Sequence, residues 1–265
     1  MDDHGFDETQ AASARQFDRR FGSYGASHIL SDTRDVSTAL AGVDVPTDGL
    51  ALDVATGGGH TALALARAGW RVCLGDVSMR MLESARELLR KEGHAVDARL
   101  FPAEAMPHPD ATFDLVTVRV APHHFSSPPT FLREAARVLK PGGRFLLIDG
   151  SVPDDEPEVD HWLNRVEKWR DPSHVRVLSP RTWRAMIEEA GMRILSLDTF
   201  ERRQPDLDWY FEAAGTTEDH RRKVLDAIRS ASPRVRQVMQ LRTEDGKVSW
   251  SWLMLSVLAT KTGES

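Results

Sequence analysis

The chain has 265 residues, of which 41% are apolar and 28% charged, and its formal net charge is −6. These proportions are typical of a globular protein and predict one large domain, or one domain with a cap, around a sizeable core. No run of Lys or Arg is long enough to follow a phosphate backbone, so the sequence predicts no nucleic acid partner. No apolar stretch approaches the roughly 20 residues that span a bilayer, so no membrane span is predicted.

The N-terminus and the cysteine content bear on the compartment. Residues Met1 to His4 are acidic and lack an apolar core, so no signal peptide is expected. The single cysteine, Cys73, rules out an internal disulfide and lies in an apolar run, where we expect a small buried side chain. Both features favour a cytoplasmic protein.

From residue 50 to 150, apolar runs typical of strands alternate with segments of helical periodicity. Strands are predicted at 50–54, 70–74, 96–101, 113–118 and 144–148, and helices at 61–68, 78–93 and 131–139. Ser78 is positioned to cap the second helix and Gly93 to end it. The alternation predicts a parallel sheet with helices on both faces, in which ligands bind beyond the carboxyl ends of the strands.

The flanking segments predict the domain organisation. Residues 1–45 form a polar, helical lid segment, 46–150 the core, 151–178 a substrate cap insertion, and 179–265 the remainder of the core sheet with added helices. Ser179-Pro180 begins a helix that ends before Gly191. Strands are expected at 192–200 and 248–260, the latter after a turn at Asp245-Gly246, and helices outside the sheet at 205–235.

A glycine cluster follows the first predicted strand. Residues 49–60 read G-L-A-L-D-V-A-T-G-G-G-H, which is an apolar run, an acid, a glycine turn and a helix start. Glycines let a ligand lie against bare backbone, and the helix that follows offers free N–H groups. Asp76 ends the second strand, 76 − 53 = 23 positions after Asp53. A carboxylate there suits two ribose hydroxyls and repels a 2′-phosphate, so an adenosine cofactor is favoured, either NAD or S-adenosylmethionine.

Three features favour S-adenosylmethionine. The glycines are contiguous rather than spaced as G-x-G-x-x-G; F-P-A-E-A-M-P at 101–107 precedes F-D-L-V at 113–116; and the chain ends in an apolar run at 250–259. With D-V-A-T-G-G-G at 53–59, G-D-V-S-x-x-M-L at 75–82 and R-V-L-K-P-G-G at 137–143, the chain resembles a class I S-adenosylmethionine-dependent methyltransferase. The resemblance is to the broad type 11 group that includes the ubiquinone and menaquinone biosynthesis C-methyltransferases. A narrower likeness is to a bacterial branch with R-x-A-x-H-H-F, here 119–125, and R-D-P-S-H-V-R, here 170–176.

The resemblance implies an α/β fold: a Rossmann-like seven-stranded sheet with an antiparallel last strand, helices on both faces and a small helical cap. It implies S-adenosyl-L-methionine as cofactor, S-adenosyl-L-homocysteine as product, and residues 46–150 as the cofactor-binding core. The residues that it assigns to the cofactor are Asp53, Ala55, Gly57, Gly59, Asp76, Val77, Met81, Ala103, Glu104 and Arg119.

For the methionine and ribose parts, the resemblance implies roles by position. The backbone of 55–59 meets the methionine part, Asp53 supports its amino group directly or through water, and Asp76 holds the ribose hydroxyls. Arg119 presents its carbonyl to the methionine amine. Ala55 stands where many relatives have a glycine, which matters little if its φ is negative.

For the adenine, the resemblance implies that Val77 and Met81 flank the ring, and that the N–H of Ala103 reads its edge with Glu104 beside it. Pro102 stands where an aspartate often accepts from the adenine amine. Because proline has no side-chain acceptor, recognition is expected to depend on backbone groups.

Methyl transfer from a sulfonium is an in-line displacement, in which the protein mainly brings the nucleophile to within about 3–3.5 Å and aligns it. A phenol, enol or amine also needs a base, and histidine suits that task. The candidates are His124 and His123, which follow the fourth predicted strand, with His124 first because it adjoins Phe125. A purely structural role for this loop pair is the alternative.

Candidate substrate residues come from the lid segment and the cap. They are Tyr24, Phe21, His28, Trp169 and His174. The alternative is that Phe17, Phe21 and Tyr24 attach the N-terminal helix to the core and that Trp162 and Trp169 pack inside the cap.

The remaining expectations concern partners and rival functions. No metal site is expected, because the histidines lack the spacing of a ligand set. The expected partner is a small-molecule methyl acceptor, and the chain is expected to act as a monomer or homodimer. Two other functions remain open: a non-catalytic protein that binds S-adenosylmethionine or S-adenosylhomocysteine, and an NAD-dependent oxidoreductase.

Overall fold

The computed structural model describes residues 5–25, 28–204, 206–244 and 247–263, with the backbone alone at 22–25, 28, 29, 244 and 247. The helices are α1 (Glu8–Gly25), α2 (His28–Ser31), α3 (Arg34–Ala39), α4 (His60–Arg67), α5 (Met79–Lys91), α6 (Pro128–Val138), α7 (Pro157–Arg170), α8 (Pro180–Glu189), α9 (Leu207–Ala214), α10 (Glu218–Arg229) and α11 (Pro233–Val238), with a 3₁₀ turn, η1 (Pro122–His124). The strands are β1 (Leu50–Val54), β2 (Arg71–Asp76), β3 (Asp97–Leu100), β4 (Phe113–Arg119), β5 (Leu139–Ser151), β6 (Met192–Arg203), β7 (Arg242–Glu244), β8 (Lys247–Ser249) and β9 (Ser251–Lys261).

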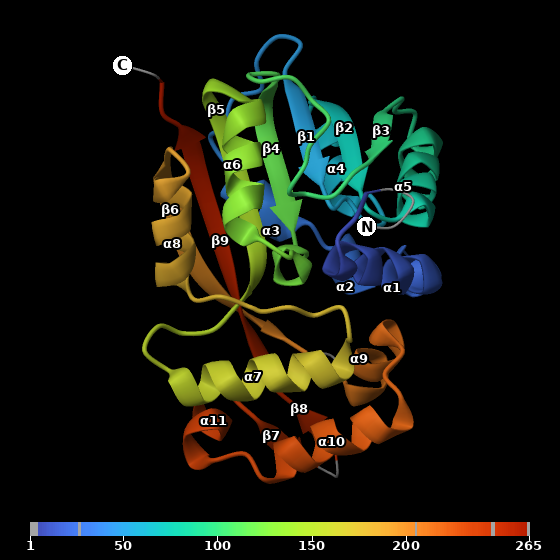
Figure 1. Cartoon of the computed structure of the whole chain (residues 1–265), viewed down its shortest axis with the longest axis vertical. Helices are drawn as coiled ribbons and strands as arrows, with labels where there is room; N and C mark the ends of the chain where they lie inside the picture. Colours follow the sequence, from blue (N-terminus) through green and yellow to red (C-terminus); the bar gives the residue numbers. More distant parts are fainter. Residues whose placement is uncertain (1–4, 26–27, 205, 245–246, 264–265) are drawn as a thin grey trace.

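Seven strands form the main sheet, in the order β3-β2-β1-β4-β5-β9-β6. The pairs from β3 to β5 are parallel, whereas β9 runs antiparallel to both β5 and β6. Helices α6 and α8 cover one face, and α3, α4 and α5 cover the other (Figure 1). The predicted Rossmann-like sheet with a reversed last strand is therefore confirmed.

The sequence patterns explain why these elements form. In β1, Leu52 and Val54 are buried in the cluster on the α6 face, while Ala51 is buried on the α4 face, as expected for a strand covered on both sides. Ser78 caps α5 by accepting from the N–H of Met81 at 3.1 Å, and Gly93 follows the helix with a φ of +83°. Local signals thus fixed the ends of this helix.

The cap is larger than the predicted insertion 151–178. We define the cap as residues 152–177 together with 207–250, because apolar residues from both segments share one buried cluster. Helices α9, α10 and α11 pack with α7 in this cap (Figure 1), so the helices expected outside the sheet contribute to a second lobe. The predicted turn at Asp245-Gly246 lies outside the described residues.

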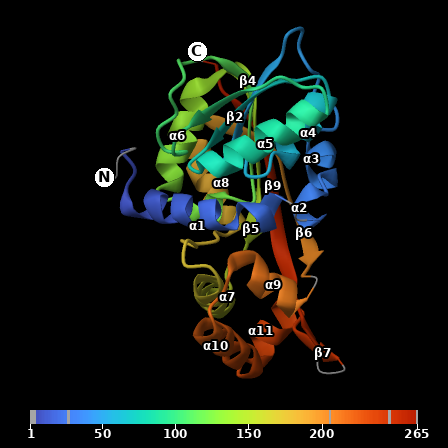
Figure 2. The ribbon, with the colours of Figure 1, turned by 90° about the vertical axis from the view of Figure 1, so that its right-hand side faces the viewer.

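Helix α1 of the lid segment lies between the core sheet and the cap. Figure 2 shows α1 crossing the molecule at the level where the sheet meets the cap, and α1 packs against both α5 and α9. The carboxyl ends of the parallel strands face the same junction (Figure 1). Within the described ranges, no helix combines the length and apolar composition needed to cross a bilayer.

Candidate active site

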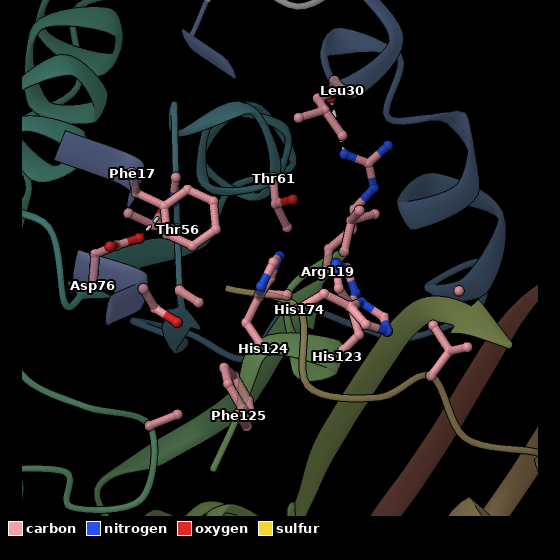
Figure 3. A pocket seen from close by; sticks show the side chains of 18 of the residues that line it. Phe17, Leu30, Thr56, Thr61, Asp76, Arg119, His123, His124, Phe125 and His174 are labelled. Atoms are coloured by element: carbon pink, nitrogen blue, oxygen red, sulfur yellow. Dashed lines mark hydrogen bonds between the residues drawn. The ribbon is translucent and has the colours of Figure 1, made fainter. Parts of the chain in front are cut away.

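A cavity of about 210 Å³ lies at this junction, at the carboxyl ends of the parallel strands. Its walls come from the turn after β1, the end of β2, the loop after β4, helix α1 and the cap. Figure 3 shows Asp76 and Thr56 on one side of the view, His123, His174 and Arg119 on the other, and His124 between them. The cavity therefore brings the predicted cofactor and histidine groups to one space.

The turn after β1 is held in a left-handed conformation. Ala55 has a φ of +52° and Gly57 a φ of +52°, and both line the cavity. The condition under which alanine matters little at this position, a negative φ, is therefore not met. A left-handed alanine costs about 1–2 kcal/mol, so this turn carries backbone strain beside the cavity.

The two predicted glycines differ in their surroundings. A Cβ on Gly57 would meet no atom within 4 Å, so open space adjoins its backbone. A Cβ on Gly59, whose φ is +86°, would stand 2.8 Å from the Cβ of Ala85 in α5. Gly59 is absent from the described cavity wall, and it permits the close approach of α4 and α5.

The Asp76 carboxylate lies at the cavity wall, at the end of β2. One of its oxygens accepts from the N–H of Gly57 and the other from the N–H of Ser78, both at 2.9 Å. Burial raises the pKa of Asp76 to about 6, although these two hydrogen bonds act in the opposite direction. The carboxylate is thus fixed in orientation and titrates close to neutral pH.

Asp53 lies deeper, below the cavity wall. Its two oxygens accept from the hydroxyls of Thr56 and Thr117, both at 2.7 Å. Burial raises its pKa to about 6 against these hydrogen bonds. Asp53 therefore holds the start of the turn to β4, and a contact with an amino group stays a prediction.

The residues predicted to contact the adenine also line the cavity. Val77, Met81 and Ala103 line the cavity, together with Glu104. The Glu104 carboxylate accepts from the N–H of Ser126 at 2.9 Å and from Gln10 Nε2 of α1 at 2.9 Å. Glu104 thereby links the lid segment to the loop that precedes α6.

Arg119 lines the cavity, but its guanidinium is bound to the lid segment. Its Nε donates to Asp35 at 3.0 Å, and its Nη groups donate to the carbonyls of Leu30 and Asp32. Arg202 of β6 donates to the same Asp35 at 2.6 Å. The three charged side chains are largely buried, so this cluster fastens α3 to the sheet; the predicted role of the Arg119 carbonyl stays a prediction.

His123 is paired with a buried acid. Its Nδ1 lies 2.7 Å from Asp149 Oδ1, and its backbone N–H donates to the other oxygen at 2.9 Å. Burial lowers the pKa of His123, but the charge of Asp149 and the hydrogen bond to it outweigh burial, and the net shift is upward. The carboxylate orients the ring through Nδ1, which leaves Nε2 for another partner.

His124 is buried between other rings. The ring of Phe17 meets it edge-on at 5.0 Å, and the centroid of His123 lies 4.2 Å away. Its Nδ1 lies 3.1 Å from the hydroxyl of Ser173. Burial and the neighbouring charge of His123 lower the pKa of His124 to about 3, so the ring is neutral at pH 7.

His174, from the cap, completes the histidine group. Its Nε2 lies 3.0 Å from Asn164 Oδ1, and its ring centroid lies 5.6 Å from that of His123. Burial and the two other histidines lower its pKa to about 2. Within the described part of the chain, no group of three or more metal-ligating side chains is arranged to hold a metal ion.

Two of the other predicted substrate residues, Trp169 and Phe21, have described side chains outside the cavity wall. Trp169 packs against the buried cluster of the cap, with Arg165 over its ring at 5.3 Å. Phe21 is 38% exposed and lies against Arg80. The side chains of Tyr24 and His28 lie outside the described residues. Of the two with described side chains, neither Trp169 nor Phe21 lines the described cavity wall.

Several wall residues were missed by the sequence analysis. They are Gln10, Ser13, Glu167, Arg170, Arg202, Trp209, Trp252 and Met254. Trp252 and Met254 lie with Leu253, which also lines the cavity, in the continuous apolar run of β9, so alternation gave no signal for them. The others depend on how the lid segment and the cap fold over the sheet, which local patterns do not encode.

Comparison with known proteins identifies the family. A profile of the methyltransferase domain matches residues 52–147. YcgJ of Bacillus subtilis, named an uncharacterized methyltransferase, is 30% identical over 244 residues, which is 91% of this chain and 95% of YcgJ. The crystal structure of a methyltransferase-type protein from Bacillus halodurans superposes with a TM-score of 0.81 at 35% identity and covers 86% of this chain and 99% of its own.

A shorter match is to the ubiquinone/menaquinone biosynthesis C-methyltransferase UbiE of Pseudoalteromonas translucida. It is 39% identical over 88 residues, which is 32% of this chain and 35% of UbiE. Identity over nearly the whole chain, together with the sheet order and the cavity at the strand ends, shows that the chain belongs to the methyltransferase family.

Proposed function

We propose that the protein is an S-adenosyl-L-methionine-dependent methyltransferase that acts on a small molecule and uses a histidine as general base. One observation carries the proposal: the Asp76 carboxylate and the histidine pair face the same cavity at the strand ends of a methyltransferase fold. Ligands of such sheets bind at this edge.

The residues around the glycine turn fit an adenosyl cofactor. Open space adjoins Gly57, and Asp76 offers a carboxylate to ribose hydroxyls. In the described structure, the hydroxyl of Ser13 lies buried at the cavity wall without a hydrogen-bond partner. Such a group costs about 1–3 kcal/mol, and a polar ligand atom would remove this cost.

When bound, the cofactor supplies a methyl group that is already activated for displacement. The remaining tasks are to bind and orient the acceptor and to take its proton. A general base works best when its pKa is near the working pH. Asp149 raises the pKa of His123, whereas the pKa of His124 is about 3. This criterion therefore supports His123 as the base, whereas the sequence analysis placed His124 first.

The first prediction concerns ligand binding. Calorimetry should detect binding of S-adenosylmethionine and S-adenosylhomocysteine, and Asp76→Ala should weaken both at least about tenfold, because charge-assisted hydrogen bonds to ribose are lost. Asp97→Ala, at an exposed acid on the adjacent strand, is the matched control and should bind normally. Unchanged affinity in Asp76→Ala would show that the ribose assignment is wrong, and binding of NAD alone would favour an oxidoreductase.

Turnover is tested with methyl-labelled S-adenosylmethionine and a small-molecule extract. The wild-type protein should label an acceptor, and His123→Gln should lower the rate by about 100-fold or more. A protein that binds the cofactor and labels nothing would be a non-catalytic binding protein.

The second prediction is a pH dependence of cofactor binding. Ribose hydroxyls donate to ionised Asp76, whose pKa is about 6, so protonation competes with binding. Affinity for S-adenosylhomocysteine should be constant well above that pH and fall by up to about tenfold per pH unit below it. Asp76→Asn should flatten the dependence. A slope that persists in Asp76→Asn would assign it to another group, of which Asp53 is the first candidate.

A further inference from the structure

A short segment of the cap is hydrogen-bonded to the loop after β4. Residues 171–176 follow α7, and the N–H groups of Val175 and Arg176 donate to the carbonyl of His123 at 2.8 and 3.1 Å. Ser173 and Asp171 are 4% and 1% exposed, although both come from a loop. Ser173 of this segment also contacts His124 of that loop.

The hydrogen bonds of Ser173 determine the proton positions on His124. Ser173 has one hydroxyl proton, and the hydroxyl donates it to Asp171 Oδ1 at 2.6 Å. The same hydroxyl oxygen lies 3.1 Å from His124 Nδ1, so it must accept there, and Nδ1 must carry the proton. In a neutral imidazole the other nitrogen then has a bare lone pair.

The surroundings keep this ring neutral. The charged and titratable groups around His124 are His123 and its partner Asp149, His174, Asp171 and Arg170. A second imidazolium 4.2 Å from His123 would be repelled by the first. The hydroxyl of Ser173 lies at Nδ1 of His124, and the backbone of Ser173 also contacts the ring. Since Nδ1 is bonded to Ser173 and His124 lines the cavity, Nε2 is the ring nitrogen offered to a ligand.

We propose that Ser173 and Asp171 are positioning residues that hold His124 in the tautomer with a bare Nε2, and that His124 thereby reads an O–H or N–H donor on the methyl acceptor. The tautomer follows from the two hydrogen bonds of the Ser173 hydroxyl, whereas recognition of the acceptor rests on the proposed function. His123 takes the proton from the reacting group, and His124 stays neutral throughout.

The acceptor class is narrowed accordingly. A fixed bare nitrogen in a buried wall favours a molecule that offers a hydrogen-bond donor, because an acceptor group placed there would leave two lone pairs facing each other. The site therefore selects a protic small molecule, such as one with a hydroxyl or amine beside the methylated atom. Since Ser173 and Asp171 come from the cap, His124 is set for this task only when the cap rests on the core.

The experiment is nitrogen NMR of histidine-labelled protein without cofactor, which does not depend on turnover. In the wild type, His124 should show a protonated Nδ1 and a lone-pair Nε2 from about pH 8 to about pH 5, while His123 titrates. Ser173→Ala should give a mixture of His124 tautomers, and Ser173→Thr, which keeps the hydroxyl, should restore the wild-type spectrum.

Two results would overturn the proposal: the opposite tautomer of His124 in the wild type, or titration of His124 near its ordinary value of 6.5. The wild-type spectrum decides the tautomer even if Ser173→Ala does not fold. Once an acceptor is in hand, Ser173→Ala should raise KM by about tenfold with little change in kcat, and an equal loss in kcat would refute the reading role. Failure of cofactor binding would refute the proposed function and leave the tautomer result standing.

Discussion

Asp35→Ala should lower the free energy of unfolding by about 3–5 kcal/mol, the cost of leaving buried charges without their partner. Asp35 accepts from Arg119 at 3.0 Å and from Arg202 at 2.6 Å, and its side chain is 6% exposed. Removing the carboxylate leaves two guanidinium groups close together at the cavity wall. The measurement is urea unfolding, read as a lower midpoint at an unchanged slope.

The neighbouring pair Arg34–Asp32 provides the control. It lies in the same segment, but its side chains are 89% and 43% exposed, so Arg34→Ala should leave the urea midpoint nearly unchanged. Limited proteolysis should also cut Asp35→Ala earlier in the lid segment, because α3 is fastened to the sheet through this carboxylate. A loss below about 1 kcal/mol in Asp35→Ala would show that the cluster does not hold the lid segment in place.

Gly59→Ala should destabilise the protein by about 2–5 kcal/mol, from left-handed backbone strain and overpacking together. The added Cβ would stand 2.8 Å from the Cβ and 2.9 Å from the Cα of Ala85, so α4 and α5 would have to separate. Neither atom belongs to a flexible side chain that could move aside. Thermal or urea unfolding measures the loss.

Gly57→Ala is the matched control, because Gly57 also has a positive φ but has no atom within 4 Å of its ideal Cβ. It should cost only the backbone strain, about 1–2 kcal/mol, and instead weaken S-adenosylhomocysteine binding, since its Cβ would enter the space proposed for the ligand. Equal stability losses in the two variants would contradict the packing role of Gly59.

The cofactor half of the molecule could be predicted from local sequence. Apolar runs marked β1, β2 and β4, helical periodicity marked the helices that follow them, and Ser78 and Gly93 marked the ends of α5. Asp76 and Gly57 could be proposed as cofactor residues because an acid at a strand end and glycines in a tight turn are visible in the sequence. The family resemblance also lies in this contiguous part of the chain, which the matched domain covers at 52–147.

Conformation and protonation within these motifs were less accessible. The positive φ of Ala55 depends on how the turn closes over β2, where Thr56 donates to the carbonyl of Gly75 at 3.0 Å. The proposed function ranks His123 ahead of His124, the reverse of the order predicted from the sequence, because Asp149, 26 positions from His123, raises the pKa of His123. The residue type shows which side chain can titrate, but the pKa of that side chain depends on the neighbours that the fold brings to it.

The sequence alone determined the alternating strands and helices from 50 to 150, the glycine turn and the acid at the end of β2, because each depends on residues close together in the chain. The tertiary structure alone decided the cap, assembled from 152–177 and 207–250, and the lid fastening of Arg119 to Asp35. It also decided the contact between His124 and Ser173, which are 49 positions apart. Such pairs form only when separate elements pack, so the chemistry offered to the methyl acceptor is a property of the assembled fold.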